Sequence, residues 1–171
     1  MVLNDYFSEV SAIADRHGGT IDKFIGDAVM ILFGAPVASG DHEQALAAVR
    51  MALDMQRAVA QLQEKWLDQG IDADFRVRMG INTGVATVGN FGSTGRMDYT
   101  AIGRQVNLAA RLQAGAGPGT IAISHPTWLL VRDQIPCRAQ GEISVKGVHQ
   151  PVKFYQVVDD VADTTDQRRL C

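Results

Sequence analysis

The sequence predicts an α+β fold with an antiparallel-rich sheet and helices packed on one of its faces. Three long segments, residues 2–17, 42–68 and the run that follows residue 103, carry apolar residues at steps of three and four, which indicates helices. Between them lie shorter segments in which apolar and polar residues alternate, in pairs separated by glycine, which is typical of antiparallel strands. This order of helices and strand pairs is that of an α+β domain.

The first predicted hairpin joins strands at residues 20–25 and 28–33, after a helix over 2–17 that ends at two glycines. Gly26 and Asp27 stand between the two strands, and glycine supplies the positive φ that a two-residue turn requires. Asp27 therefore lies at the tip, where a carboxylate could hold a hard cation. An isolated Gly-Asp pair is more often only a turn, so both interpretations stay open at this point.

The longest predicted helix covers residues 42–68, and Asp41 is its predicted N-cap. Residues 75–82 then alternate and predict a strand buried on one face, which we expect to form a hairpin with a second strand over 85–91. Residues 92–98 are expected to form a mobile loop, and residues 99–102 an extended segment.

The last third predicts a helix from Gly103 that ends at residues 117–119, a strand over 120–124 and a short helix over 125–131. Two further strands are expected on either side of residues 147–150. The end of the chain, residues 159–171, is polar and is expected to be a frayed tail.

Composition limits the class of protein. The 171 residues are 46% hydrophobic and 20% charged, as expected of one soluble globular domain. A net charge of −3 argues against a general nucleic-acid binder. The two cysteines, Cys137 and Cys171, lack metal-type spacing and are expected to be free thiols. No apolar run of membrane-spanning length and no signal peptide are visible, so we expect a cytoplasmic domain, although its parent protein could be tethered to a membrane.

Several polar residues are candidates for binding a phosphorylated ligand. Asn107 and Arg111 are four residues apart on a predicted helix, so their side chains share one face, where an amide and a guanidinium suit a sugar hydroxyl and a phosphate. A solvated helix face is the simpler interpretation of that pair alone. Arg78 and Lys146 stand near glycines, and together with Lys23 they could surround a polyphosphate, although each alone is more often a surface residue.

Four motifs in order, GGTIDKFIGDAVM, RVRMGINTGVATVGNFGS, DYTAIGRQVNLAARL and VKG, resemble the catalytic domain of class III nucleotidyl cyclases. The resemblance predicts one cyclase domain over residues 1–158, followed by the tail at 159–171. It implies a ferredoxin-like βαββαβ core and a homodimer with active sites at the subunit interface. It also implies two divalent metal ions, Mg²⁺ or Mn²⁺, conversion of ATP to 3′,5′-cyclic AMP and pyrophosphate, and an N-terminal sensor or regulatory domain in the parent protein.

By position, the resemblance assigns Asp27 to metal binding, and Lys23 and Thr100 to recognition of the purine. Lysine with aspartate or threonine at these positions goes with adenine in this family, whereas guanylyl cyclases typically carry glutamate in place of the lysine. An ammonium and a hydroxyl can donate to acceptor nitrogens of adenine.

The same resemblance assigns the ribose and the phosphates to four further side chains. It matches Asn107 to orientation of the ribose and Arg111 to stabilisation of charge on the α-phosphoryl group. Arg78 and Lys146 match the contacts to the triphosphate.

The sequence departs from the family at one point. The family's first metal-binding aspartate lies on a strand with the pattern Asp-Ile-x-Gly-Phe-Thr, and this chain starts too late to contain that strand. Asp5 and Asp22 lack that context. We therefore expect little or no cyclase activity from the chain as given. An impaired cyclase-homology module for dimerisation or nucleotide binding is the alternative.

Two other protein classes with similar cores fit less well. A diguanylate cyclase would carry a Gly-Gly-Asp/Glu-Glu-Phe hairpin, which is not visible in this sequence. A ferredoxin-like RNA-binding module would carry exposed aromatic residues for base stacking and a more basic surface.

Overall fold

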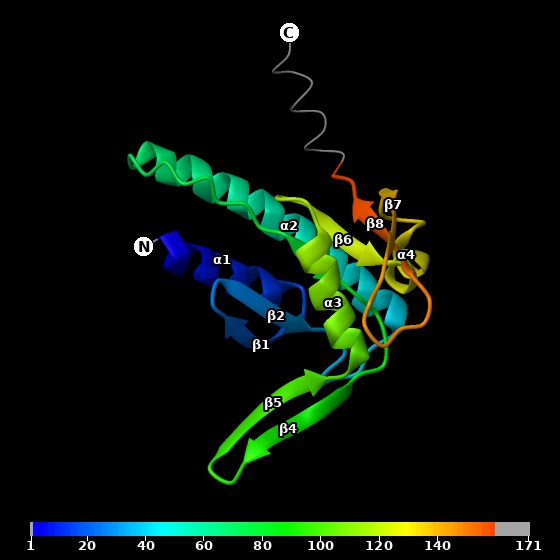
Figure 1. Cartoon of the computed structure of the whole chain (residues 1–171). Coiled ribbons are helices and arrows are strands. Elements are labelled where there is room, and N and C mark those ends of the chain that lie inside the picture. Colours follow the sequence, from blue (N-terminus) through cyan, green and yellow to red (C-terminus); the bar gives the residue numbers. More distant parts are fainter. Residues whose placement is uncertain (1, 160–171) are drawn as a thin grey trace.

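The computed structural model describes residues 2–159 and confirms the α+β class (Figure 1). Of the expected tail over 159–171, residues 160–171 lie outside the described residues, whereas Asp159 is described and accepts hydrogen bonds from Arg57. The helices follow the predicted periodicity closely, and the short helix matches its predicted bounds. In chain order the elements are α1 (Val2–Arg16), β1 (Thr20–Ile25), β2 (Ala28–Leu32), α2 (Asp41–Asp68), β3 (Met79–Ile81), β4 (Thr87–Ser93), β5 (Arg96–Ile102), α3 (Arg104–Gly115), β6 (Ile121–Ser124), α4 (His125–Val131), β7 (Cys137–Ile143) and β8 (Val152–Val157).

Four strands form the central sheet in the order β3-β6-β8-β7, in which β3 and β6 are parallel and the other pairs are antiparallel. All four residues of β6 are buried. Ile121 and Ile123 pack against α2, whereas Ala122, on the opposite side of the strand, packs against α3. Helices therefore cover both faces of this sheet, and the prediction that they lie on one face is wrong.

The first predicted hairpin is confirmed. Strands β1 and β2 pair antiparallel, and Gly26, at the turn, has a φ of +62°. The register shifts between Ile21 and Lys23, so Asp22 is an extra residue on β1, as in a β-bulge. The hairpin packs beside α1, which in turn packs on α2 (Figure 1).

The second predicted hairpin is wrong in its pairing. Strand β4 pairs along its whole length with β5, and residues 92–98, expected to be a loop, belong to this hairpin, which projects from the rest of the molecule (Figure 1). The preceding residues 75–78 are not a strand. Instead, side-chain amides from α2 donate to their backbone: Gln56 to the carbonyl of Val77 at 2.7 Å, and Gln63 to that of Phe75. These bonds replace a strand partner, while the apolar side chains of the segment pack on the core.

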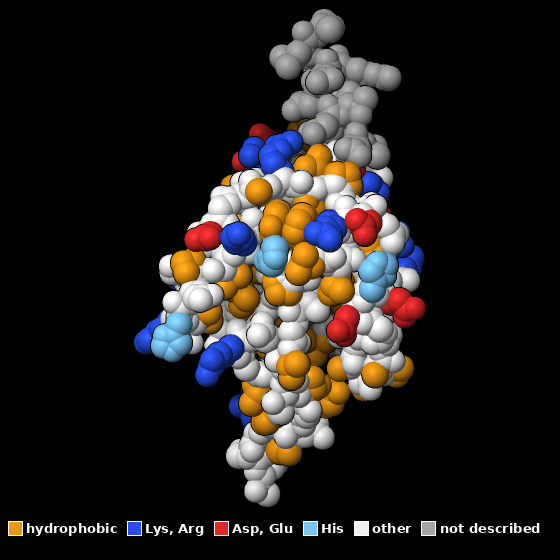
Figure 2. All heavy atoms as spheres, turned by 90° about the vertical axis from the view of Figure 1, so that its right-hand side faces the viewer, with side chains coloured by type: hydrophobic (Ala, Val, Ile, Leu, Met, Phe, Trp, Pro, Cys, Tyr) orange, Lys and Arg blue, Asp and Glu red, His pale blue; other side chains and the backbone are white. Residues whose placement is uncertain are grey.

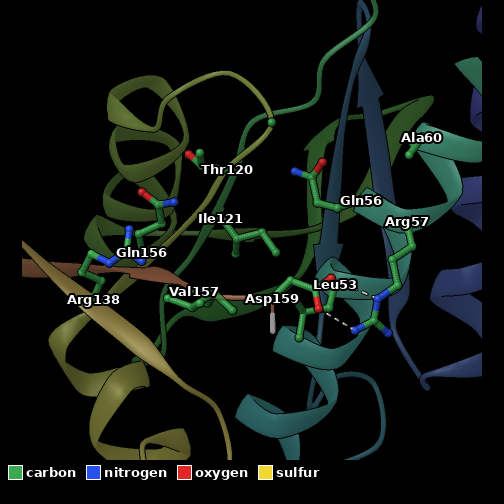
Figure 3. A pocket seen from close by; sticks show the side chains of 12 residues that line it. Leu53, Gln56, Arg57, Ala60, Thr120, Ile121, Arg138, Gln156, Val157 and Asp159 are labelled. Atoms are coloured by element: carbon green, nitrogen blue, oxygen red, sulfur yellow. Dashed lines mark hydrogen bonds and ion pairs between the residues drawn. The ribbon is translucent and has the colours of Figure 1, made fainter. Parts of the chain in front are cut away.

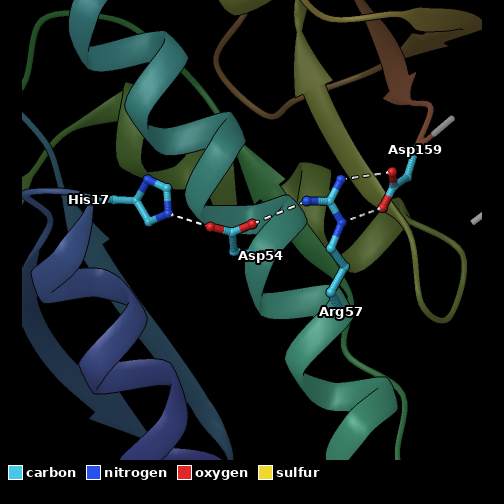
Figure 4. Close-up of polar contacts among 4 residues, drawn as sticks. All are labelled: His17, Asp54, Arg57 and Asp159. Carbon is cyan, nitrogen blue, oxygen red and sulfur yellow. Dashed lines mark hydrogen bonds and ion pairs between the residues drawn. The ribbon is translucent and has the colours of Figure 1, made fainter. Parts of the chain in front are cut away.

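A chain of polar contacts ties the end of α1 to α2 and to the residues after β8 (Figure 4). His17 Nε2 lies 2.7 Å from Asp54 Oδ2, and Asp54 also faces Arg57 on the same helix. Arg57 donates to both carboxylate oxygens of Asp159, at 2.9 and 3.0 Å, and these hydrogen bonds raise its pKa. The network fixes the described end of the chain against the longest helix.

Two expectations drawn from composition concern the cysteines and membrane-spanning segments. Cys137 is a free thiol whose burial raises its pKa to about 11, and Cys171 lies outside the described residues. Among residues 2–159, none of the helices combines the length and the apolar character that crossing a membrane requires.

Candidate active site

Two of the predicted site residues, Lys23 and Thr100, come together at a buried carboxylate. Thr100 is 6% exposed on β5 and donates its hydroxyl hydrogen to Asp22 Oδ2 at 2.6 Å. Lys23 Nζ lies 3.8 Å from the other carboxylate oxygen of Asp22, whose side chain is 1% exposed. Adjacent strand residues normally point to opposite sides, and the bulge at Asp22 explains how Asp22 and Lys23 share one.

This geometry corrects one chemical expectation. The hydroxyl of Thr100 was expected to donate to the base, but its hydrogen is directed to Asp22, with the carbonyl of Ala101 at 3.4 Å as a weaker acceptor. The role of Asp22 was missed in the sequence, because the residue lies 78 positions from Thr100 and only the folded chain joins them.

Asn107 and Arg111 lie on the exposed face of α3, as their spacing predicts. On the opposite face, Leu108 and Leu112 are buried against β6 and Val145. Both side chains are exposed, and among residues 2–159 neither makes a side-chain hydrogen bond or ion pair, so both are available to a ligand. Their position depends on how α3 is held.

Two features of the segment MGINTG fix α3, and sequence reasoning did not assign them a role. A Cβ on Gly80 would stand 2.3 Å from the backbone nitrogen of Gln113 and 2.4 Å from the carbonyl oxygen of Ala109, so glycine permits α3 to approach β3 closely. Asn82 donates from Nδ2 to both the carbonyl oxygen of Gln105, at 3.0 Å, and its side-chain oxygen, at 2.8 Å. In the sequence, the only signals for these two contacts are the glycine and the asparagine of this segment.

The other two predicted cations lie near the same helix. Arg78 is exposed and donates to the carbonyl of Ala114 at 3.4 Å, in the last turn of α3, where a cation is favoured. Lys146 is exposed and follows Val145, which packs against the buried face of α3. Arg78, Lys146, Asn107 and Arg111 are therefore all associated with one helix.

Asp27 stands apart from these residues, exposed at the tip of the β1–β2 turn. The pKa of the Tyr6 phenol on α1 is raised, chiefly by burial and secondly by the charge of Asp27. Within residues 2–159 there is no group of three or more His, Cys, Asp or Glu side chains that could hold a metal ion. Asp22 is already engaged by Thr100 and Lys23. The described residues of one chain therefore do not fit a site for two metal ions.

A cavity of about 380 Å³ lies between α2 and the sheet, where β6 begins and β8 ends (Figure 3). Its two arginines are Arg57, which is paired with Asp159, and Arg138 on β7. None of the seven predicted site residues lines it. The candidate residues lie instead around α3 and on the two hairpins, and all of them except Lys23 and the buried Thr100 are exposed.

The chain is therefore an α+β domain in which Lys23 and Thr100 meet at Asp22, and four further polar side chains are associated with α3. The family model described as "Adenylate and Guanylate cyclase catalytic domain" matches residues 1–159, and the chain belongs to this family. The resemblance stated from the four motifs is confirmed.

Individual relatives and solved structures agree with this assignment. The crystal structure of the adenylyl cyclase CyaB from P. aeruginosa matches with 52% identity and a TM-score of 0.90, over 93% of this chain and 81% of that one. The crystal structure of the guanylyl cyclase Cya2 matches with 36% identity and a TM-score of 0.84, over 93% of this chain and 80% of that one. "Adenylate cyclase 1" of Rhizobium meliloti is 34% identical over 92% of this chain, which spans only 24% of that relative's length.

Proposed function

We propose that this chain is the catalytic domain of an adenylyl cyclase, which converts ATP to 3′,5′-cyclic AMP and pyrophosphate. The observation that carries the proposal is the pairing of Lys23 and Thr100 at Asp22, beside the helix that bears Asn107 and Arg111. Because solved cyclases of similar fold include both an adenylyl and a guanylyl cyclase, the fold does not decide the base. Lys23 in place of glutamate supports adenine.

In the proposed reaction the ribose 3′-oxygen attacks the α-phosphorus, the bond from that phosphorus to the β-phosphate oxygen breaks, and pyrophosphate leaves. Asn107 hydrogen-bonds the ribose and holds the 3′-oxygen in line with the leaving group. Arg111 stabilises the charge that builds on the α-phosphoryl oxygens. The 3′-hydroxyl proton passes to water, and no side chain of this chain is proposed as its base.

Arg78 and Lys146 are proposed to bind the triphosphate. Both cations are exposed, and each lies next to α3. Arg78 reaches the last turn of that helix, so it is held without a carboxylate partner among residues 2–159. A guanidinium suits a phosphate with two parallel hydrogen bonds, whereas an ammonium acts as a point charge.

Two divalent ions, Mg²⁺ or Mn²⁺, remain part of the proposal, with Asp27 as a metal ligand. Because one described chain supplies no acidic cluster, the remaining ligands would come from outside residues 2–159 of that chain. No step of the mechanism above depends on them. A homodimer, in which the hairpin tip of one chain completes the surface around α3 of the other, is consistent with the position of Asp27 on the first hairpin and of Asn107 and Arg111 on α3.

Exposed apolar side chains support the homodimer. Phe24 and Ile25 on β1 are 46% and 59% exposed, and Met97 and Tyr99 on β5 are 58% and 42% exposed. Hydrophobic side chains cover much of the narrow lower end of the molecule, where hairpin β4–β5 projects (Figure 2). Apolar patches of this kind mark interaction surfaces. An N-terminal sensor or regulatory domain and a cytoplasmic location belong to the proposal as well.

The alternative function, a cyclase-homology module that binds nucleotide or dimerises without turnover, is favoured by the absence of an acidic cluster among residues 2–159. One assay separates the two functions. The purified chain is incubated with ATP or GTP and Mn²⁺, and both nucleotide binding and cyclic nucleotide are measured. Cyclic AMP formation supports the enzyme, and binding without product supports the nucleotide-binding module. The absence of both excludes these two functions and leaves a dimerisation module, which sedimentation velocity would detect.

The base specificity has its own test. Lys23→Glu combined with Thr100→Cys replaces the donor with a carboxylate, which suits the N1–H and amino group of guanine. We expect the ratio of affinities for ATP and GTP to shift toward GTP by about tenfold or more, since each mismatched polar contact costs roughly 1–3 kcal/mol. Lys153→Glu, an exposed lysine on β8, is the matched control. An unchanged ratio in the double variant would remove these two residues from base recognition.

A further inference from the structure

The carboxylate of Asp22 is fully engaged inside the chain. Its Oδ2 atom accepts the Thr100 hydroxyl at 2.6 Å and the backbone N–H of Ala101 at 3.4 Å. Its Oδ1 atom faces the Lys23 ammonium at 3.8 Å, which is an ion pair and too long for a hydrogen bond. The Asp22 side chain is 1% exposed and contacts three groups on two strands, so its position is fixed.

These contacts determine which way Thr100 can bond. A hydroxyl has one hydrogen and two lone pairs. The hydrogen of Thr100 is given to Asp22, and the next acceptor within reach, the carbonyl of Ala101, also belongs to the chain. What Thr100 offers to a ligand is therefore an acceptor, whereas Lys23, 41% exposed, offers only donors.

We propose that Asp22 is a specificity-determining residue, because it orients the Thr100 hydroxyl and so converts the Lys23–Thr100 pair into one donor beside one acceptor. Adenine presents an acceptor nitrogen, N1, beside a donor, its 6-amino group, and matches this pair. Guanine presents a donor, N1–H, beside an acceptor, O6, and would meet a like group at both positions. The inference rests on the proposed function and explains how a threonine, which could bond either way, discriminates between the two bases.

The β-bulge in β1 allows Asp22 to orient Thr100 while Lys23 faces the ligand. In a regular strand Asp22 and Lys23 would point to opposite sides, and the carboxylate could not reach Thr100 while its neighbour faced the ligand. The extra residue in β1 brings both to one side. Asp22 acts through Thr100 and does not itself touch the base, so its effect is on selectivity.

The test measures binding of three nucleotides that lack the 3′-hydroxyl nucleophile and so bind without turnover, with Mn²⁺ present. They are 3′-deoxyATP, 3′-deoxyGTP and the 3′-deoxy analogue of purine riboside triphosphate. The last, the reference, keeps the N1 acceptor of adenine but carries only hydrogen at the 6-position, so its comparison with the adenine analogue separates the 6-position contact from a weakened fold or a changed Lys23. The variants are Asp22→Leu, Thr100→Val and their combination. Asp98→Asn, an exposed acid on β5, is the control.

We expect the unchanged chain and Asp98→Asn to prefer the adenine analogue over the guanine analogue by about tenfold or more. Asp22→Leu leaves the Thr100 hydrogen only the weak acceptor at the carbonyl of Ala101, 3.4 Å away, so the hydroxyl can donate to O6 of guanine instead. Binding of the guanine analogue should then improve relative to the reference, and the preference should fall about tenfold. Thr100→Val should weaken the adenine analogue relative to the reference, and adding Asp22→Leu to it should change nothing further.

The proposal is overturned if the preference for the adenine analogue is unchanged in Asp22→Leu. It is also overturned if Asp22→Leu lowers that preference equally in the unchanged chain and in the Thr100→Val variant. Either result leaves the proposed function intact. If no nucleotide binds the unchanged chain, the proposed function fails and the inference fails with it. If Asp22→Leu does not fold, Thr100→Val decides: weaker binding of the guanine analogue, with the adenine analogue unaffected, would show that Thr100 donates to the base and would overturn the proposal.

Discussion

Asp5, in the first turn of α1, illustrates how a single charge can make folding depend on pH. The indole of Trp66, which is fully buried, donates to Asp5 Oδ2 at 3.1 Å, and Lys65 Nζ lies 3.3 Å from the same atom. The hydrogen bond from Trp66, followed by that from Lys65, lowers the pKa of Asp5 below 3.8. The folded chain therefore binds this proton less tightly than the unfolded chain.

The sign of the effect follows from that difference. The stabilisation is complete above a pH of about 4 and is lost as the pH falls through the lowered pKa of the folded state. Asp5→Asn keeps an acceptor for Trp66 and removes the charge. We expect its melting temperature to lie a few degrees below that of the unchanged chain at neutral pH, and the two values to converge in strong acid.

Thermal unfolding followed by circular dichroism at neutral and strongly acidic pH checks this expectation. Asp15→Asn, an exposed acid near the end of the same helix, is the control and should show no convergence. A difference for Asp5→Asn that stays constant between the two pH values would mean that its charge has no part in stability.

At the scale of elements, the packing of α3 on β3 depends on Gly80. Any larger residue places its Cβ against the backbone of α3, at Gln113 and Ala109, and a backbone cannot rotate away as a flexible side chain can. Overpacking of this kind destabilises by roughly 1–3 kcal/mol. We therefore expect Gly80→Ala to lower the free energy of unfolding by that amount in urea denaturation, and to weaken nucleotide binding because Asn107 and Arg111 move with α3.

Gly115→Ala is the matched control for this change. Gly115 is the last residue of α3, and a Cβ there would meet nothing within 4 Å. Alanine favours a helix over glycine by up to about 1 kcal/mol, so this variant should be as stable as the unchanged chain or more so. Equal stabilities for the two alanine variants would argue against a close approach of α3 to β3.

Elements were predictable where one local pattern determined them. The helices follow periodicity, and the first hairpin follows from Gly26 and Asp27. The alternation over residues 75–82 was misleading, because an alternating segment needs a partner for its backbone, and here Gln56 and Gln63 of α2 take that place. An alternating pattern indicates which side chains are buried, but it does not indicate which groups form hydrogen bonds with the backbone.

At the scale of the whole molecule, the sequence motifs identified the groups proposed to bind the ligand but not the groups that orient them. Asn107 and Arg111 were found by type and spacing, whereas Lys23 and Thr100 were assigned by the resemblance to the cyclase family. The roles of Asp22 and Asn82 depend on bonds to residues 78 and 23 positions away, which no local pattern contains. That helices cover both faces of the sheet was equally invisible, because the short strand β6 is uniformly buried and does not alternate.

Assembly is the remaining property at this scale, and β5 offers the sharpest test of it. Met97 and Tyr99 lie two positions apart and share the exposed side of the strand, opposite buried Thr100. Aspartate at both positions would have to be buried unpaired in a dimer that uses this face, which is costly. We expect the unchanged chain to be a dimer in sedimentation velocity, and Met97→Asp with Tyr99→Asp to be a monomer with a similar melting temperature.

Val37→Asp combined with Leu129→Asp adds the same charge at two other exposed apolar positions, 80% and 47% exposed, and is the control. It should remain a dimer, because Leu129 lies on α4 and Val37 lies in the loop that follows β2, at the opposite end of the first hairpin from its tip. If the unchanged chain is a monomer, or if the control dissociates as readily as the β5 variant, the exposed hairpins have no specific part in dimer formation. The position of Asp27 on a different element from Asn107 and Arg111 would then need a different explanation.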